Sequence, residues 1–284
     1  MSNLTHYRCL VRAQTGNEAF YQNYWAYAEH IGAAVDKITE AAIANGVTTP
    51  EPRELDPFNV DNLQCKVAPH ASAEVFWSVS KAFFEPEPIF RLPYGIIASG
   101  TEGESDVEDI TAGYKRQKDD KGMTTLEINV ARSDLLSLYE LLLNAHPVYK
   151  VFWYLLHDHW DHAADKFLVN ESLNAPGQII SHIRTNEYDS LKNGYVTLTS
   201  YHEEGATNVN ISDHKRITIF THSDDIAHAY AQTLRLAGYP ETSELVSIDC
   251  RIHHWHYRSS DSRAREELIT YLRQSGFLDW SPKP

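Results

Sequence analysis

Three features of other protein classes are missing from this sequence. No stretch approaches the roughly 18 consecutive apolar residues that a membrane-spanning helix needs. The first residues show no basic segment followed by a long apolar core, so we expect no secretory signal. The cysteines Cys9, Cys65 and Cys250 are too far apart for a disulfide framework or a zinc finger, which predicts a cytoplasmic protein.

Positive charge is also scarce. The 284 residues include 25 lysines and arginines against 39 aspartates and glutamates, which gives a formal net charge of −14. Nucleic-acid binding needs clustered cationic side chains, so we expect no nucleic-acid partner, and the acidic charge favours a basic protein partner. The sequence contains no G-x-G-x-x-G, no G-x-x-x-x-G-K-[ST] and no G-x-S-x-G, which argues against the common nucleotide-binding loops and the serine-hydrolase elbow.

The first part of the chain, residues 1–110, is predicted to be mainly helical with short strands. A capping pattern at residues 15–18 is followed by an apolar stripe of helical period that ends at Asn45, and a second helix is expected over residues 71–84. The acidic run at residues 102–109 is expected to be an exposed loop that separates this part from the rest. Short strands are expected at residues 6–12, 63–67 and 96–98.

The second part, residues 111–284, carries an internal repeat. Residues 124–162 and 215–257 each read as strand, helix, strand, and Tyr139 matches Tyr230 at a constant offset. Two such copies predict an α+β fold with ferredoxin-like β-α-β repeats, beside the helical N-terminal part. The second strands of the copies are expected at residues 151–156 and 245–249, further strands at 178–183 and 195–201, and a C-terminal helix at 261–274.

The densest chemistry lies between His157 and His162, which spell H-x-H-x-D-H. This pattern resembles the metal-binding motif of the metallo-β-lactamase superfamily. The resemblance implies that His157, His159 and His162 bind zinc or another divalent metal, with Asp161 serving a second ion. The motif comes past mid-chain, unlike in that superfamily. The sequence does not choose the further ligands among His202, Asp213, His214, Asp249 and His253.

A second cluster of histidines surrounds Trp255 near the C-terminus. In the repeat, His254 and Trp255 match His159 and Trp160, whereas the acidic positions have no counterpart, which favours a structural role at the end of a sheet. If the copies pack about a pseudo-twofold axis, both clusters meet in one pocket. That pocket would contain His157, His159, His253, His254 and His256.

Residues 217–239 run as strand, acidic cap, alanine-rich helix and Gly-Tyr. This segment resembles the small domain of the ribonuclease E inhibitor (RraB-like) family, and the chain also resembles the acidic immunity proteins that neutralise bacterial toxins. The resemblance implies a non-enzymatic cytoplasmic inhibitor, without a cofactor, that binds a basic partner such as a nuclease-type toxin. The candidate contact residues are Glu102, Glu104, Asp106, Glu108, Asp109, Glu203 and Glu204.

Two alternatives to an inhibitor remain open at the level of sequence. A metal-dependent hydrolase would use His157, His159, Asp161 and His162. A structural protein would use the His/Trp segments, with Trp160 and Trp255, as the seam of a homodimer.

Overall fold

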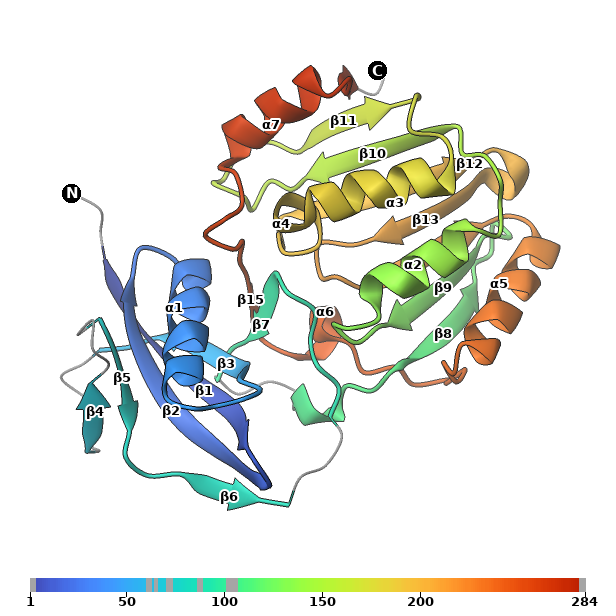
Figure 1. The fold of residues 1–284 in the computed structure, drawn as a ribbon. Coiled ribbons are helices and arrows are strands. Elements are labelled where there is room, and N and C mark those ends of the chain that lie inside the picture. Colours follow the sequence, from blue (N-terminus) through green and yellow to red (C-terminus); the bar gives the residue numbers. More distant parts are fainter. Residues whose placement is uncertain are drawn as a thin grey trace.

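Two β-sheets carry most of the chain in the computed structural model, which describes residues 4–59, 63, 66–69, 74–85, 89–100 and 107–280 (Figure 1). Strands make up 35% of the structure and helices 27%. The predicted fold class, with a mainly helical N-terminal part, was therefore wrong. The fold is mostly β, with eight strands in each sheet.

The first sheet has the strand order β15-β7-β3-β1-β2-β5-β4, and β6 also pairs with β2. Helix α1 (Ile31–Ala44) packs on this sheet. The strands are β1 (Thr5–Thr15), β2 (Glu18–Ala28), β3 (Glu51–Pro57), β4 (Val67–Pro69), β5 (Val75–Ser78), β6 (Ala82–Phe84), β7 (Ile96–Ala98) and β15 (His254–His256). Because β15 comes from the far end of the chain, this sheet draws on both sides of the boundary expected at residues 102–109.

The helix predicted from residues 15–18 to Asn45 divides into a strand and a helix. Its first half is β2, which pairs with β1 along its whole length. β2 has buried side chains on both faces, so its aromatic run shows no clean two-residue alternation and also fits a helical stripe. The helix begins only at Ile31, where the His30 ring accepts a hydrogen bond from the Ala33 N–H (3.1 Å).

For two further segments the predicted secondary structure was wrong, with helix and strand exchanged. The described part of residues 71–84 contains β5 and β6 instead of a helix, since β5 pairs with both β2 and β4. Residues 178–183 lie in helix α3 (Pro176–Thr185) instead of a strand. The missed signal there is Pro176 at the first helical turn, where its fixed φ suits a helix start. Of the strand predicted at 63–67, residues 64 and 65 lie outside the described residues, and Val67 begins β4.

The second sheet has the order β16-β11-β10-β12-β13-β14-β9-β8, and all neighbouring strands are antiparallel. Helices α2 (Leu135–Leu143), α3, α5 (Asp224–Leu236) and α7 (Arg265–Gln274) bury their apolar sides in one core with it (Figure 1). The strands are β8 (Gly113–Lys118), β9 (Thr124–Asn129), β10 (Val151–Leu156), β11 (Lys166–Asn170), β12 (Val196–His202), β13 (Thr207–Ile211), β14 (Ile217–Thr221) and β16 (Leu278–Trp280). Among the described residues, no helix has both the length and the apolar character needed to cross a membrane.

The expected ferredoxin-like repeat is only half present. β9 with α2 and β14 with α5 do correspond, and the two strands are neighbours. Three strands separate β9 from β10, however, and residues 245–249 form no strand. Instead, these residues run into the short helix α6 (Ile248–Arg251). Arg216 donates a hydrogen bond to Ser247 and forms an ion pair of 2.9 Å with Asp249. The chain then crosses to the first sheet as β15.

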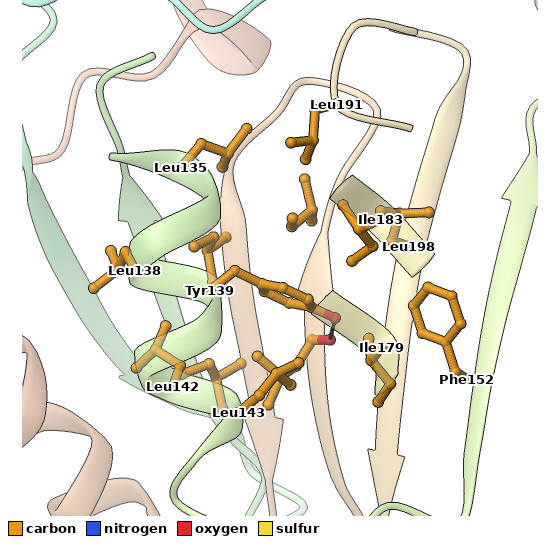
Figure 2. Close-up of a cluster of buried hydrophobic side chains, with 14 of the residues drawn as sticks. Leu135, Leu138, Tyr139, Leu142, Leu143, Phe152, Ile179, Ile183, Leu191 and Leu198 are labelled. Atoms are coloured by element: carbon orange, nitrogen blue, oxygen red, sulfur yellow. Dashed lines mark hydrogen bonds between the residues drawn. The ribbon is translucent and has the colours of Figure 1, made fainter. Parts of the chain in front are cut away.

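Helices α2 and α3 bury the middle of the second sheet. Figure 2 shows the ring of Tyr139 of α2 pointing towards Ile179 and Ile183 of α3, with Phe152 of β10 beside them. The Tyr139 hydroxyl donates to the carbonyl of Val209 (3.1 Å) and also bonds the hydroxyl of Ser200 (2.9 Å). These bonds satisfy the polar atom that burial would otherwise leave unpaired.

His182, also on α3, couples the stability of this core to pH. Its Nε2 lies 3.0 Å from the Tyr154 hydroxyl, and burial lowers its pKa to about 4. An unfolded imidazole has a pKa of about 6.5, so the native state binds fewer protons between these values. Stability therefore falls as the pH drops from about 6.5 towards 4, by about 2 kcal/mol at this residue.

The substitution His182→Gln tests this prediction, because glutamine can still bond Tyr154 but does not titrate. We expect urea unfolding at pH 7 and pH 4.5 to show the variant gaining about 2 kcal/mol relative to the wild type on acidification. His228→Gln, on the exposed side of α5, is the control and should follow the wild type. If the wild type and His182→Gln lose the same unfolding free energy on acidification, His182 is not the group that couples stability to pH.

Candidate metal centre

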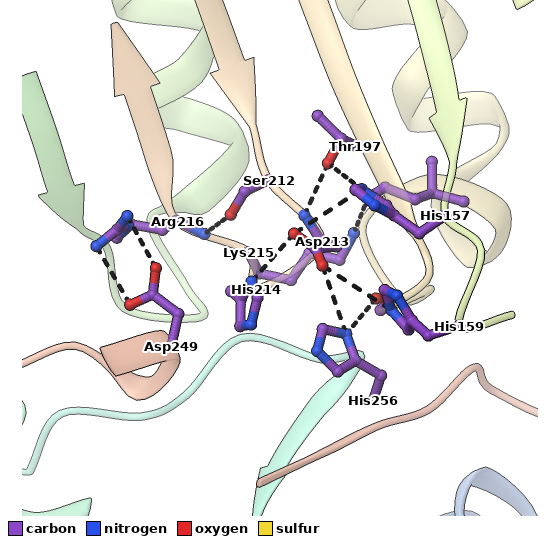
Figure 3. Close-up of polar contacts among 12 residues, drawn as sticks. His157, His159, Thr197, Ser212, Asp213, His214, Lys215, Arg216, Asp249 and His256 are labelled. Carbon is purple, nitrogen blue, oxygen red and sulfur yellow. Dashed lines mark hydrogen bonds and ion pairs between the residues drawn. The ribbon is translucent and has the colours of Figure 1, made fainter. Parts of the chain in front are cut away.

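Five histidines and one aspartate meet where one end of the second sheet touches β15 (Figure 3). The end of β10 supplies His157 and His159, and the turn between β13 and β14 supplies Asp213 and His214. The first sheet supplies His254 and His256, both on β15. The two sheets thus share one cluster, which we call the Asp213 cluster: His157, His159, Asp213, His214, His254 and His256.

The carboxylate of Asp213 lies at the centre of this cluster. Its Oδ1 is 3.0 Å from His214 Nδ1 and 3.9 Å from His157 Nε2. Its Oδ2 is 3.9 Å from His159 Nε2 and 4.0 Å from His256 Nδ1. One carboxylate therefore faces imidazoles from three segments of the chain.

The cluster contains two sets of donors that could each hold a metal ion. In one set, His157, His159 and Asp213 bring ligand atoms within 4.8 Å of one another, and His214, His254 and His256 do the same in the other. The sets adjoin, because the rings of His214 and His256 are 4.7 Å apart between centroids. The arrangement could hold one ion or two neighbouring ions.

The second set is oriented by hydrogen bonds that fix its tautomers. His254 Nδ1 lies 2.8 Å from the carbonyl of Ile252, and His256 Nδ1 lies 2.5 Å from the carbonyl of Gly194. A carbonyl oxygen only accepts, so each Nδ1 carries the proton and each Nε2 keeps its lone pair. His214 Nδ1 faces the Asp213 carboxylate in the same way. Metal-binding histidines are held by this kind of second bond.

Burial sets the charge of the donors. It lowers the pKa of His157 and His254, and it lowers the pKa of His256 to about 3. Burial alone would raise the pKa of Asp213, but the hydrogen bond from His214 and the neighbouring imidazoles hold it well below its usual range. Neutral imidazoles and an ionised carboxylate are the forms that bind divalent metals.

The turn that contains Asp213 is held in place by the buried side chain of Lys215. The neighbouring Lys215 has a φ of 57°, and its buried Nζ donates to the carbonyls of Ser190 and Val196 (2.9 and 3.0 Å). Burial lowers the pKa of Lys215 to about 7. The Asp213 N–H donates to the hydroxyl of Thr197 (3.0 Å), which in turn bonds His157 Nε2 (2.8 Å).

A backbone contact beside the cluster fixes the spacing of the sheets. Gly194, just before β12, donates its N–H to the carbonyl of Tyr257, and the Tyr257 N–H donates to the carbonyl of Gly95 (both 2.8 Å). A Cβ at Gly194 would lie 1.9 Å from the Gly95 oxygen, and Gly95 itself has a φ of 91°. Neither position therefore accommodates a side chain without displacement of the other backbone.

Only part of the H-x-H-x-D-H motif at residues 157–162, the linear motif, belongs to the Asp213 cluster. His157 and His159 belong to it, whereas Asp161 and His162 follow in an exposed turn with φ of 59° and 53°. Between them, Trp160 is buried and stacks on Tyr195. Asp161 and His162 are in neither donor set.

The expectation that the two His/Trp segments meet agrees with the geometry for four of the five histidines named. His253 instead is exposed and lies against Trp255, with centroids 5.7 Å apart. Asp213 and His214 were among the residues that the sequence left unchosen. One sequence signal could have identified these two residues. They lie in a turn between two strands, where neither an aspartate nor a histidine is needed to cap a helix.

A cleft of about 270 Å³ adjoins the cluster. Tyr195 connects the two, because its ring is part of the cleft wall and lies 5.4 Å from the ring of His159. The other wall residues include Tyr7, Trp160, Asp161, Tyr257 and Arg258.

The residues predicted for an acidic contact face are partly engaged within the chain. Glu108 forms an ion pair with Arg53 (3.1 Å), and Glu203 pairs with Lys150. Asp109 and Glu204 are exposed. Glu102, Glu104 and Asp106 lie outside the described residues.

Comparisons of the chain with protein-family models, with curated proteins and with solved structures found no match. The resemblance of residues 217–239 to the RraB-like family therefore stays a prediction. The functional proposal has to come from the residues themselves.

Proposed function

We propose that this chain is a metal-dependent hydrolase whose zinc or other divalent ion is bound by the Asp213 cluster. The observation that carries the proposal is the orientation of His214, His254 and His256. Each donates Nδ1–H to an oxygen and keeps Nε2 available for an ion.

The donor set favours catalysis over a structural role for the ion. Structural zinc sites are closed by four protein ligands, often cysteines, whereas catalytic sites keep a position open beside three ligands such as histidines. The cluster supplies histidines and one carboxylate, and the side chain of His159 is 36% exposed. An ion there would be reachable by water and substrate.

The protein's own groups would have separate roles. Asp213 orients His214, Thr197 orients His157, and the cleft beside Tyr195 would bind substrate. The aromatic walls of that cleft favour a substrate with a planar or apolar group. A bound divalent ion supplies Lewis acidity toward a carbonyl or phosphoryl oxygen.

The inhibitor hypothesis rests on the net charge of −14 and on the resemblance of residues 217–239 to the RraB-like family. Of its candidate contact residues, Glu108 and Glu203 form ion pairs within the chain. A cytoplasmic location, inferred from the spacing of the cysteines, is compatible with either function. Cys9 fits it, as a free thiol buried in the first sheet.

The neighbouring residues His253 and His254 allow a matched test of the proposal. With zinc or manganese added, we expect the intact chain to hydrolyse a chromogenic ester or phosphodiester, such as p-nitrophenyl acetate or bis(p-nitrophenyl) phosphate. His254→Ala should lower the rate at least about 100-fold through loss of a ligand, and His253→Ala should leave it unchanged.

Two outcomes would contradict different parts of the proposal. Stoichiometric metal that His254→Ala removes, without hydrolysis of any ester, phosphate or amide in a broad panel, would rule out the enzyme and leave the metal site. Failure to bind zinc or manganese would rule out both.

A further inference from the structure

A third group of metal-type donors lies far from the Asp213 cluster. His146 follows α2, His202 is the last residue of β12, and Glu204 begins the short 3-10 turn Glu204–Ala206. One donor atom from each lies within 4.8 Å of the others. The rings of His146 and His202 stack with centroids 4.0 Å apart.

This group lies at the opposite end of the second sheet from the Asp213 cluster. β12 begins beside Thr197, which bonds His157, and ends at His202. A strand rises about 3.3 Å per residue, so Thr197 and His202 are roughly 17 Å apart. One ion cannot serve both groups.

His146 provides an independent sign that a ligand belongs here. Its side chain is buried, at 8% exposure, and its Nε2 has no hydrogen-bond partner among the described residues. A buried polar atom without a partner costs about 1–3 kcal/mol. Burial and the nearby His202 lower the pKa of His146.

The loop that carries Glu204 is held in place. The Thr207 hydroxyl donates to the Glu204 carbonyl (2.8 Å), and the His222 N–H donates to the Gly205 carbonyl (2.7 Å). The Glu204 N–H donates to His202 Nδ1 (3.2 Å), a bond that His202 would exchange if it binds an ion through this nitrogen.

We propose that His146, His202 and Glu204 form a second, separate site for a zinc-class divalent ion. Two imidazoles and one carboxylate are a donor set for such ions, with room for water or another ligand. The site does not depend on the hydrolase proposal, since it shares no residue with the Asp213 cluster.

Zinc titration in a chain that carries Asp213→Asn favours this site over the first, whose zinc affinity that change lowers about 100-fold. We expect one zinc ion to bind in that background, and the added change Glu204→Gln to weaken its binding at least about tenfold. Glu203→Gln is the matched control, an exposed neighbour that pairs with Lys150, and it should change the affinity less than twofold. Cobalt should show visible absorption that Glu204→Gln reduces.

His202→Ala gives a second route, because His202 is only partly buried and its loss threatens folding less than that of His146. It should also weaken zinc binding at least about tenfold. The proposal is wrong if the Asp213→Asn chain binds no zinc, or if neither Glu204→Gln nor His202→Ala changes the affinity.

Discussion

The substitution Asp213→Asn is expected to weaken zinc binding at the Asp213 cluster about 100-fold. Asparagine keeps the size of the side chain but removes the negative charge and the strong acceptor for His214 Nδ1–H. Loss of a partner that orients a ligand typically lowers metal affinity 10–100-fold. Here Asp213 also belongs to the set with His157 and His159, so the upper end of that range applies.

The linear motif supplies the control for this measurement. Asp161→Asn changes the acidic residue that the H-x-H-x-D-H pattern would make a ligand, in a turn where asparagine tolerates the positive φ. Isothermal titration with zinc should give an affinity for Asp161→Asn within about twofold of the wild type. The reverse ranking of the two variants would show that the linear motif binds the ion and that the Asp213 cluster does not.

The substitution Gly194→Ala is expected to lower the free energy of unfolding by at least about 2 kcal/mol. The added methyl group would lie 1.9 Å from the Gly95 oxygen, so backbone must move. Because the Gly194 carbonyl also bonds His256, the same movement would shift β15 away from Asp213. We therefore expect zinc affinity to fall together with stability.

Urea unfolding and zinc titration of the same samples test this expectation. Gly177→Ala is the control, since a Cβ there meets no atom within 4 Å. Alanine in that helix should leave zinc affinity unchanged and stabilise the fold by up to about 1 kcal/mol. Wild-type stability and affinity in Gly194→Ala would mean that the glycine contact does not set the spacing of the sheets.

Parts of both sheets were predictable from the sequence. Strands were expected where β1 and β7 lie in the first sheet and where β10, β12 and β14 lie in the second. β10 and β14 both have the expected bounds, and in β10 buried and half-buried side chains alternate strictly. β2 departs from this rule, since Ala19 and Trp25 are buried on the face opposite to that of Phe20, Tyr24 and Ala26. β2 is a strand because it pairs with β1 and β5, and this pairing cannot be predicted from the local sequence pattern.

The same limit applies to the candidate site. His157 and His159 stand out in sequence because they are crowded together, whereas His254 and His256 reach them from the first sheet, where the predicted repeat did not place them. Asp213 shows no such crowding. Its central place follows from the order β10-β12-β13, which brings the β13–β14 turn beside the end of β10, and a ferredoxin-like arrangement predicts a different order.

The convergence of three distant segments on Asp213 has a consequence for folding kinetics. His157, Asp213 and His256 are separated by tens of residues, so the unfolded chain must close two long loops before these donors meet. Zinc would then bind the native state far better than the unfolded chain. At a free concentration 100 times its dissociation constant, such an ion raises stability by about 2.7 kcal/mol. Interactions that are absent from the folding transition state act on the unfolding rate, so zinc held by three distant segments would slow unfolding and lengthen the lifetime of the native protein.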